Sequence, residues 1–152
     1  QKGKTHVLHI IRELLSFEPT STGTDMAKAL QYFSNAQKRH CTAFLISDFI
    51  GVEGLEKPLM IASNRHEVNA IQIYDRRETE LPNVGLVKFH DAETGQDVWV
   101  DTAIASVREQ YASEWKQNQS RIEQLCTKTG VKRMSVRTDE DYVKALMKLF
   151  KS

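Results

Sequence analysis

Oxygen-bearing side chains gather at points of the sequence where helices or strands are expected to begin or end. Gly23, Thr24 and Asp25 precede one apolar periodic stretch, and Ser47 with Asp48 closes a short apolar run. Hydroxyl and carboxylate oxygens suit Mg²⁺, a hard cation that usually keeps several waters. Thr24 and Asp48 are therefore candidate metal ligands. The alternative is that both residues only cap a helix or a turn, which is a common role for these residue types.

A further acidic residue, Asp75, follows the apolar run 68–74 and precedes two arginines. In an open α/β sheet, ligands bind outside the carboxyl ends of the strands. Asp75 therefore joins Gly23, Asp25 and Ser47 as a candidate residue of a binding rim. The simpler interpretation is a surface ion pair between Asp75 and a neighbouring arginine, and such pairs contribute only ~0–1 kcal/mol.

The sequence carries no positive signal for enzymatic catalysis. The five histidines show no zinc spacing apart from the adjacent residues His40 and Cys41. Neighbouring residues of a strand point to opposite faces, so these two are not expected to form a nucleophile–base pair. His6 and His9 share a helix face and are expected to be solvated. Phosphate-binding glycine loops and the Gly-x-Ser-x-Gly pattern are absent, so we expect a non-catalytic protein.

The apolar pattern predicts the elements that must position these residues. Stripes at helical spacing predict helices over about 4–16, 24–39, 104–128 and 139–151, with a further helix that begins near Pro58. A short apolar run predicts a strand at 42–47, and the stretch 68–74 predicts the next. The alternation of Met134 and Val136 predicts a last strand at 132–137. Strand 42–47 is expected to be buried on both faces, as in a parallel sheet. Strand, helix and strand at this spacing are typical of a right-handed βαβ unit.

Glycines and polar residues predict how several of these elements end. Segments 84–90 and 96–101 predict an inserted β-hairpin at about 84–101, with Gly95 available for a positive φ. Gly130 is expected to end the long helix.

Two helix starts are predicted from capping residues. Thr24 is the expected N-cap of the second helix, and Thr138 with Asp141 resembles a capping box before the last one. The last helix is expected to bury Tyr142 and Val143 in the core.

Composition limits the class of protein. The 152 residues are 40% hydrophobic and 27% charged, which is typical of a soluble globular domain. The net charge of +1 argues against a nucleic-acid binder and against a polybasic membrane anchor. No apolar run of about 20 residues predicts a membrane segment. Two distant cysteines without a signal-peptide pattern predict a reduced, cytoplasmic protein.

Several short strings together resemble a known family over essentially the whole chain. They are Gly23-Thr24-Asp25, Leu45-Ile46-Ser47-Asp48, Arg65-His66-Glu67-Val68, Ile73-Tyr74-Asp75, Glu80-Leu81-Pro82-Asn83-Val84-Gly85, Asp91-Ala92-Glu93-Thr94-Gly95 and Thr138-Asp139-Glu140-Asp141-Tyr142. The family is the von Willebrand factor A-like bacterial proteins of domain-of-unknown-function family fifty-eight. Arg76 departs from it, since relatives commonly have Pro there. The resemblance implies an α/β fold with a doubly wound, Rossmann-like, mostly parallel sheet flanked by helices.

The resemblance also implies a metal-ion-dependent adhesion site built from three loops. Thr24 matches the second loop and Asp48 the third, but the Asp-x-Ser-x-Ser of the first loop occurs nowhere in this chain. We therefore expect residues 1–152 to form a single truncated domain that lacks its N-terminal strands. Mg²⁺ is expected to bind the full-length protein and not this piece alone. Strand 42–47 would then be an exposed apolar edge, which predicts self-association through this edge or pairing with a missing segment supplied from elsewhere.

The function implied by the resemblance is protein interaction. Family members are often encoded beside MoxR-type ATPases and other von Willebrand A proteins, which suggests an assembly or chaperone-like partnership with one of them. A metal with one open coordination position could accept a carboxylate from that partner. Two alternatives remain open: an α/β enzyme or nucleotide-binding domain that uses the strand-end crevice, and a scaffold whose metal site is inactive.

Overall fold

A computed structural model describes residues 3–18, 23–90 and 95–149, and the structural statements that follow concern those residues. The elements along the chain are α1 (Lys4–Ser16), α2 (Met26–Ala36), β1 (Thr42–Ser47), α3 (Glu56–Ser63), β2 (Glu67–Tyr74), α4 (Arg76–Thr79), β3 (Leu86–His90), β4 (Asp97–Asp101), α5 (Ala105–Thr129), β5 (Lys132–Arg137) and α6 (Tyr142–Leu149). Every predicted helix and strand is present, and the short helix α4 was not predicted.

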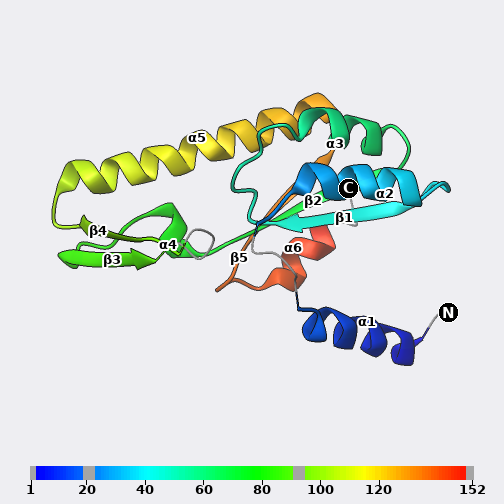
Figure 1. Cartoon of the computed structure of the whole chain (residues 1–152), viewed down its shortest axis with the longest axis horizontal. Helices are drawn as coiled ribbons and strands as arrows, with labels where there is room; N and C mark the ends of the chain where they lie inside the picture. Colours follow the sequence, from blue (N-terminus) through cyan, green and yellow to red (C-terminus); the bar gives the residue numbers. More distant parts are fainter. Residues whose placement is uncertain (1–2, 19–22, 91–94, 150–152) are drawn as a thin grey trace.

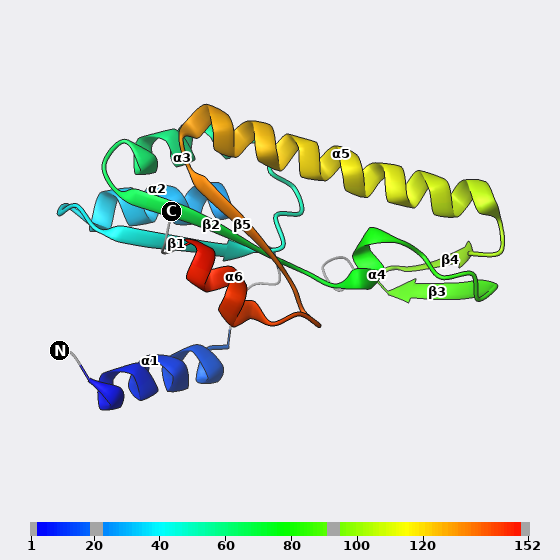
Figure 2. The same ribbon diagram turned by 180° about the vertical axis from the view of Figure 1, so that it is seen from behind.

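A three-stranded parallel sheet with the order β1-β2-β5 forms the centre of the fold. Thr42 pairs with Glu67, and Asn69 pairs with Lys132, so the three strands run side by side in the same direction. Helices α2, α3 and α5 lie over one face, and α6 lies on the other (Figures 1 and 2). The prediction of a parallel α/β sheet flanked by helices is confirmed.

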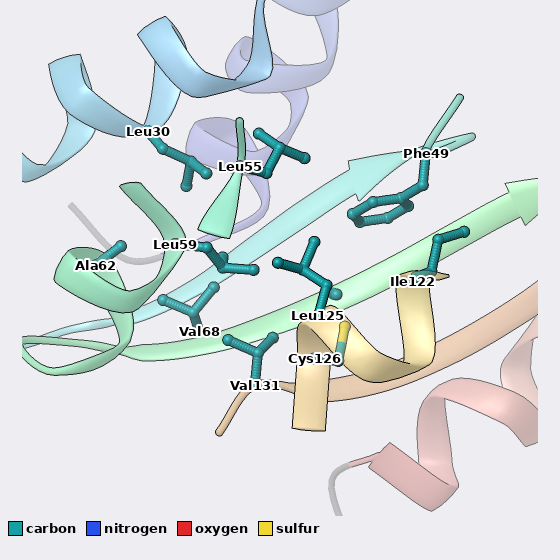
Figure 3. Close-up of a cluster of buried hydrophobic side chains, with 11 residues drawn as sticks. Leu30, Phe49, Leu55, Leu59, Ala62, Val68, Ile122, Leu125, Cys126 and Val131 are labelled. Carbon is teal, nitrogen blue, oxygen red and sulfur yellow. The ribbon is translucent and has the colours of Figure 1, made fainter. Parts of the chain in front are cut away.

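The hydrophobic core lies between the sheet and the three helices that share one face. Leu59 of α3 and Ile122 of α5 are fully buried (Figure 3), and Ala70 of β2 belongs to the same buried cluster. Burial of a Leu or Ile side chain contributes about 1.5–3 kcal/mol, so these contacts hold the helices on the sheet.

Burial along β1 alternates, so the expectation of a strand buried on both faces is wrong. Ala43 and Leu45 are half-buried on the core face, whereas Ile46 on the opposite face is 59% exposed. The physical reason is the position of α6, which packs on β5 and leaves the outer face of β1 accessible. Strand β2 lies between two strands and has five consecutive buried residues.

Helix α1 forms over the predicted residues, but none of its residues is buried. Its apolar side chains are 44% to 84% exposed: Val7, Leu8, Ile10, Ile11, Leu14 and Leu15. Both views place this helix apart from the sheet (Figures 1 and 2). The amphipathic pattern therefore predicts the helix correctly, but no described part of the chain packs against its apolar stripe.

Two predicted helix caps are wrong. Asp25, not Thr24, caps α2, because its carboxylate accepts the Lys28 backbone N–H at 2.9 Å. Asp141 accepts the Val143 N–H at 3.0 Å, and the Thr138 hydroxyl instead donates to Asp75. The predicted capping box is therefore absent.

The expected burial of the last helix is also wrong at its first turn. Tyr142 is 61% exposed and Val143 is 49% exposed. Helix α6 packs on β5, which is an edge strand of the sheet, so fewer neighbours are available to cover its first turn.

The predicted hairpin forms a separate two-stranded antiparallel sheet in which Leu86 pairs with Asp101. Gly95 has φ 70°, as predicted, while residues 91–94 of the expected turn lie outside the described residues. Helix α5 runs from this hairpin to the main sheet and ends at Gly130, which has φ 68° (Figure 1). Within the described ranges, no helix combines the length and apolar character needed to cross a membrane.

Candidate functional site

The carboxyl ends of the three parallel strands point to one end of the sheet. Ser47, Tyr74 and Arg137 are the last residues of these strands. The first turn of α2 lies at the same end, since α2 runs antiparallel to β1 (Figures 1 and 2). The residues predicted to form a rim therefore come from loops on one side of the fold, where open α/β sheets bind ligands.

Ser47 and Asp48 build a tight turn after β1. The Phe49 N–H donates to Ser47 Oγ at 3.0 Å, and the Ile50 N–H donates to Asp48 Oδ1 at 3.1 Å. Ser47 Oγ also donates to Asp48 Oδ1 at 3.3 Å. The turn-capping interpretation of Asp48 thus describes this structure, and one of its carboxylate oxygens is already engaged by the backbone.

Phe49 holds this turn in an unusual conformation. Its φ is 57°, in the left-handed region that bulky residues rarely adopt. The ring is completely buried in the core (Figure 3), and the Phe49 carbonyl accepts from Asn118 Nδ2 at 3.3 Å. Such backbone conformations cost about 1–3 kcal/mol and persist only when surrounding packing enforces them. The buried ring therefore fixes the position of Asp48 at the rim.

A buried polar network lies beneath the rim, and sequence reasoning missed it. Gln72 is fully buried, and its Nε2 donates to the Asp48 carbonyl at 3.2 Å. Its Oε1 accepts from Arg133 Nη2 at 2.7 Å and from Ser135 Oγ at 3.1 Å. Arg133 also donates to the side chain of Gln119 on α5. A glutamine within the mostly apolar stretch 68–74 was the available signal, because buried amides require partners.

Asp75 joins the ends of β2 and β5. Its carboxylate accepts the Arg77 N–H at 2.8 Å and the Thr138 hydroxyl at 3.0 Å. Glu78 accepts the Asp75 N–H at 2.9 Å, which completes a capping box at the start of α4. The hydrogen bond from the Arg77 backbone and, second, the one from the Thr138 hydroxyl lower the pKa of Asp75 below its ordinary value of 3.8.

A polar hollow of about 720 Å³ lies beside Asp75, bounded also by Arg77 and Asp139. Of the two arginines considered as ion-pair partners of Asp75, Arg76 instead pairs with Glu80 at 3.2 Å. Acidic and basic groups therefore both face the hollow, which gives it no strong preference for an anion or a cation.

Thr24 and Gly23 are exposed at the rim. Across residues 3–18, 23–90 and 95–149, no hydrogen bond joins either of them to Asp48 or Asp75, and no group of three or more His, Cys, Asp or Glu side chains is assembled for a metal. The structure thus places the predicted ligands at one end of the sheet, and their shared metal site stays a prediction.

A second polar pair, also missed from sequence, lies at the opposite end of the sheet. Cys41 Sγ is 3.6 Å from His66 Nδ1. Each residue directly precedes a strand, and the paired register of Thr42 with Glu67 brings the two side by side. Knowledge of that register would have predicted the pair, because adjacent positions of parallel strands share a face.

The chain is similar in sequence to one protein family and to several bacterial proteins. The family described as "Protein of unknown function DUF58" matches residues 1–121. An uncharacterized protein of Mycobacterium avium is 31% identical over 136 residues, which cover 88% of this chain and 79% of that protein. Uncharacterized proteins of Mycobacterium tuberculosis and Mycobacterium bovis are 29% identical over 154 residues, with 99% of this chain covered. The chain spans 48% of the length of these longer relatives. No solved structure matches the chain.

Proposed function

The chain belongs to the DUF58 family of proteins of unknown function, and we propose that it is a von Willebrand A-like protein-interaction module rather than an enzyme. The parallel order β1-β2-β5, with helices on both faces, supports a doubly wound, Rossmann-like sheet of this type. Polar loops at the carboxyl ends of the strands support a rim at which such a sheet would meet its partner.

The exposed edge of β1 is the observation that carries the proposal. Strand β1 pairs with β2 on one side, and no other strand of the described chain flanks it on the other. Its residues Thr42–Ser47 include no charge and no proline, the devices that usually protect an edge strand. An apolar groove of about 390 Å³, lined by Leu30, Phe33 and Leu45, opens between α2 and this edge. A strand from another chain could continue the sheet and place side chains in the groove.

The metal rim is the second part of the proposal. Mg²⁺ favours octahedral oxygen coordination, and Thr24 with Asp48 can supply only part of it. Asp48 Oδ1 already accepts a backbone N–H, so these two residues do not by themselves fit the ion. We assign the ion to a longer protein in which a further loop supplies the remaining ligands. One coordination position left open by that protein would accept a carboxylate from its partner.

The partner that the family resemblance suggests is a MoxR-type ATPase or a related von Willebrand A protein, with an assembly or chaperone-like role for the complex. A test uses the full-length protein and a purified MoxR-type ATPase in sedimentation velocity, with Mg²⁺ and with EDTA. A complex that forms with Mg²⁺ and is weakened by EDTA supports the proposal. Two separate sedimenting species under both conditions would count against this partner.

Calorimetric titration of the full-length protein with Mg²⁺ and Mn²⁺ tests the rim itself. We expect heat of binding that is lost in Asp48→Ala and weakened in Thr24→Ala. Asp139→Ala is the matched control, because Asp139 is an exposed rim acid outside the proposed ligand set. No heat from the full-length protein, or equal loss in the control, would contradict the assigned ligands.

The hollow beside Asp75 supports one alternative, an α/β enzyme or nucleotide-binding domain that uses the strand-end crevice. Titration of the same protein with ATP and ADP separates the two proposals. Saturable nucleotide binding that Arg77→Ala removes would favour the alternative.

A further inference from the structure

Cys41 and His66 form a thiol–imidazole pair at the amino ends of β1 and β2. The Glu67 N–H donates to the Cys41 carbonyl at 3.0 Å, which extends the ladder between the two strands by one step. The same backbone contact holds the two side chains on one face, with Sγ 3.6 Å from Nδ1. That distance suits a hydrogen bond to sulfur, so the pair is arranged before any ligand arrives.

The imidazole of His66 is buried and packs against an aromatic ring. His66 is 4% exposed, and its ring packs against Phe33 with the ring centroids 4.8 Å apart. Its backbone N–H donates to Ala62 at the end of α3 at 2.9 Å. Nε2 is buried and has no hydrogen-bond partner among the described residues. Cys41 is therefore the hydrogen-bond partner that the described structure provides for this ring.

Solvent reaches Cys41 but hardly reaches the other thiol of the chain. Cys41 is partly exposed, whereas Cys126 is 4% exposed within the core. Burial raises the pKa of the Cys126 thiol, which keeps that sulfur protonated and unreactive. The two cysteines thus form an internal comparison between a paired, accessible thiol and an unpaired, buried one.

We propose that Cys41 and His66 form a thiol-modification site that exchanges with low-molecular-weight disulfides. With its own proton on Nε2, His66 accepts the Cys41 proton at Nδ1. The Cys41 thiolate attacks one sulfur of the disulfide, a new S–S bond forms, and the original S–S bond breaks. The leaving thiolate takes the proton from Nδ1. One thiol and one disulfide thus give a mixed disulfide on Cys41 and one free small thiol.

This site is separate from the rim discussed above. The pair lies at the amino ends of the strands, and Asp48 and Asp75 follow the carboxyl ends of the same strands. A failed metal titration therefore leaves the thiol site unaffected, and the reverse also holds.

The experiment treats the folded chain at pH 7 with 2-hydroxyethyl disulfide, a neutral probe, and locates the adduct by peptide mass spectrometry. We expect a mixed disulfide on Cys41 and none on Cys126 over the same period. In denaturant the two thiols should react at similar rates, because the fold no longer distinguishes them. Equal reactivity of Cys41 and Cys126 in the folded chain would overturn the proposal.

Substitution of the imidazole tests its part in the reaction. A neighbouring general base activates a thiol as a nucleophile, so His66→Phe should slow the reaction of Cys41 by about tenfold or more. Phenylalanine preserves the ring that packs on Phe33. His40→Ala is the matched control. The exposed His40 ring lies near His66, with the ring centroids 6.4 Å apart, and no described hydrogen bond joins His40 to the Cys41 sulfur. Its rate should match that of the wild type.

A purely structural role for His66 predicts a different result. In that case His66→Phe would shift the unfolding midpoint and leave the rate of the folded protein unchanged, which would refute proton transfer. If His66→Phe does not fold, His66→Gln serves instead, since an amide also cannot accept the proton and the same loss of rate is expected.

Discussion

The carboxylate of Asp75 shows how a rim residue can serve the fold. It receives hydrogen bonds from the backbone of α4 and from Thr138 after β5, so it connects two strand ends that are 63 residues apart in sequence. The acidic side chain was predicted as a binding group because of its place after a strand. In the structure the Asp75 carboxylate links the end of β2 to the end of β5 through hydrogen bonds.

The lowered pKa of Asp75 predicts a pH dependence of stability. Because the folded-state pKa lies below the ordinary value of 3.8, the stabilisation is present above that value and is lost as the pH falls through the folded pKa. Asp75→Asn keeps a capping oxygen but cannot titrate. The gap in unfolding midpoint between wild type and variant should be widest near neutral pH and should narrow in acid.

Thermal unfolding at a series of pH values measures this gap. Thr138→Val provides the comparison, since it removes the second cause of the shift and leaves the larger one, the Arg77 backbone hydrogen bond. A gap of constant size from neutral to strongly acidic pH would contradict this account.

The network around Gln72 predicts a larger effect on stability. Gln72→Leu removes the donor to the Asp48 carbonyl and one of the acceptors of the Arg133 guanidinium, which keeps its bonds to Gln119, at a cost of about 1–3 kcal/mol. Urea denaturation measures the free energy of unfolding. The double variant Gln72→Leu with Arg133→Met should recover part of the loss, because removal of both partners leaves fewer unpaired groups. Strictly additive losses would show that the two side chains do not interact.

At the scale of elements, α1 and β1 show that a sequence pattern and its burial are separate properties. Both segments have the apolar pattern expected of their type, yet no residue of α1 is buried and β1 is half-buried on one face only. A periodic stripe identifies an element and the face available for packing. The partner surface that would cover this face comes from other segments of the chain. For the outer face of the sheet that partner is α6, which packs on β5 instead of β1.

Substitutions on α1 should therefore have little effect on global stability. Leu14 and Leu15 are 73% and 84% exposed, so Leu14→Ser and Leu15→Ser should each change the free energy of unfolding by less than about 0.5 kcal/mol. The control Leu59→Ala removes a fully buried side chain and should cost about 2–5 kcal/mol. Urea denaturation compares the three; a loss in the α1 variants as large as that of the control would mean that the stripe is packed.

The edge of β1 predicts self-association of the chain. Sedimentation velocity at increasing concentration should show species larger than the monomer, and Ile46→Lys should reduce them, because a charge on an edge strand opposes pairing with another strand. Ile61→Lys is the control, since Ile61 is a similarly exposed isoleucine on α3, away from this edge. A wild-type chain that stays monomeric at high concentration, or equal effects of both substitutions, would refute association through β1.

Apart from helix α1, the described residues form a packed α/β part and a hairpin, and helix α5 extends from one to the other (Figure 1). No residue of β3 or β4 is buried. The hairpin is anchored at its base, where the buried Thr102 hydroxyl donates to the Gly85 carbonyl at 2.7 Å. Isolated two-stranded hairpins are at best marginally stable. The two parts should therefore open with different free energies.

Hydrogen exchange measured by mass spectrometry tests this difference. Amides of β3 and β4 should exchange faster than those of β2, which opens only with the core. Amides of β2 serve as the internal reference for global unfolding. Equal protection in the hairpin and in β2 would show that the molecule unfolds as one cooperative unit.

The sequence by itself determined the elements of this protein and the direction of its sheet. Apolar runs, helical stripes and the glycines at 95 and 130 act over a few residues, so they could be read along the chain. Whether Thr24 and Asp48 share a metal remains a prediction. Only the tertiary structure decided that Asp75 binds Thr138, that Gln72 holds Arg133 and that Cys41 lies beside His66. Strand register controls those pairings, and register is set by packing among segments that are distant in sequence.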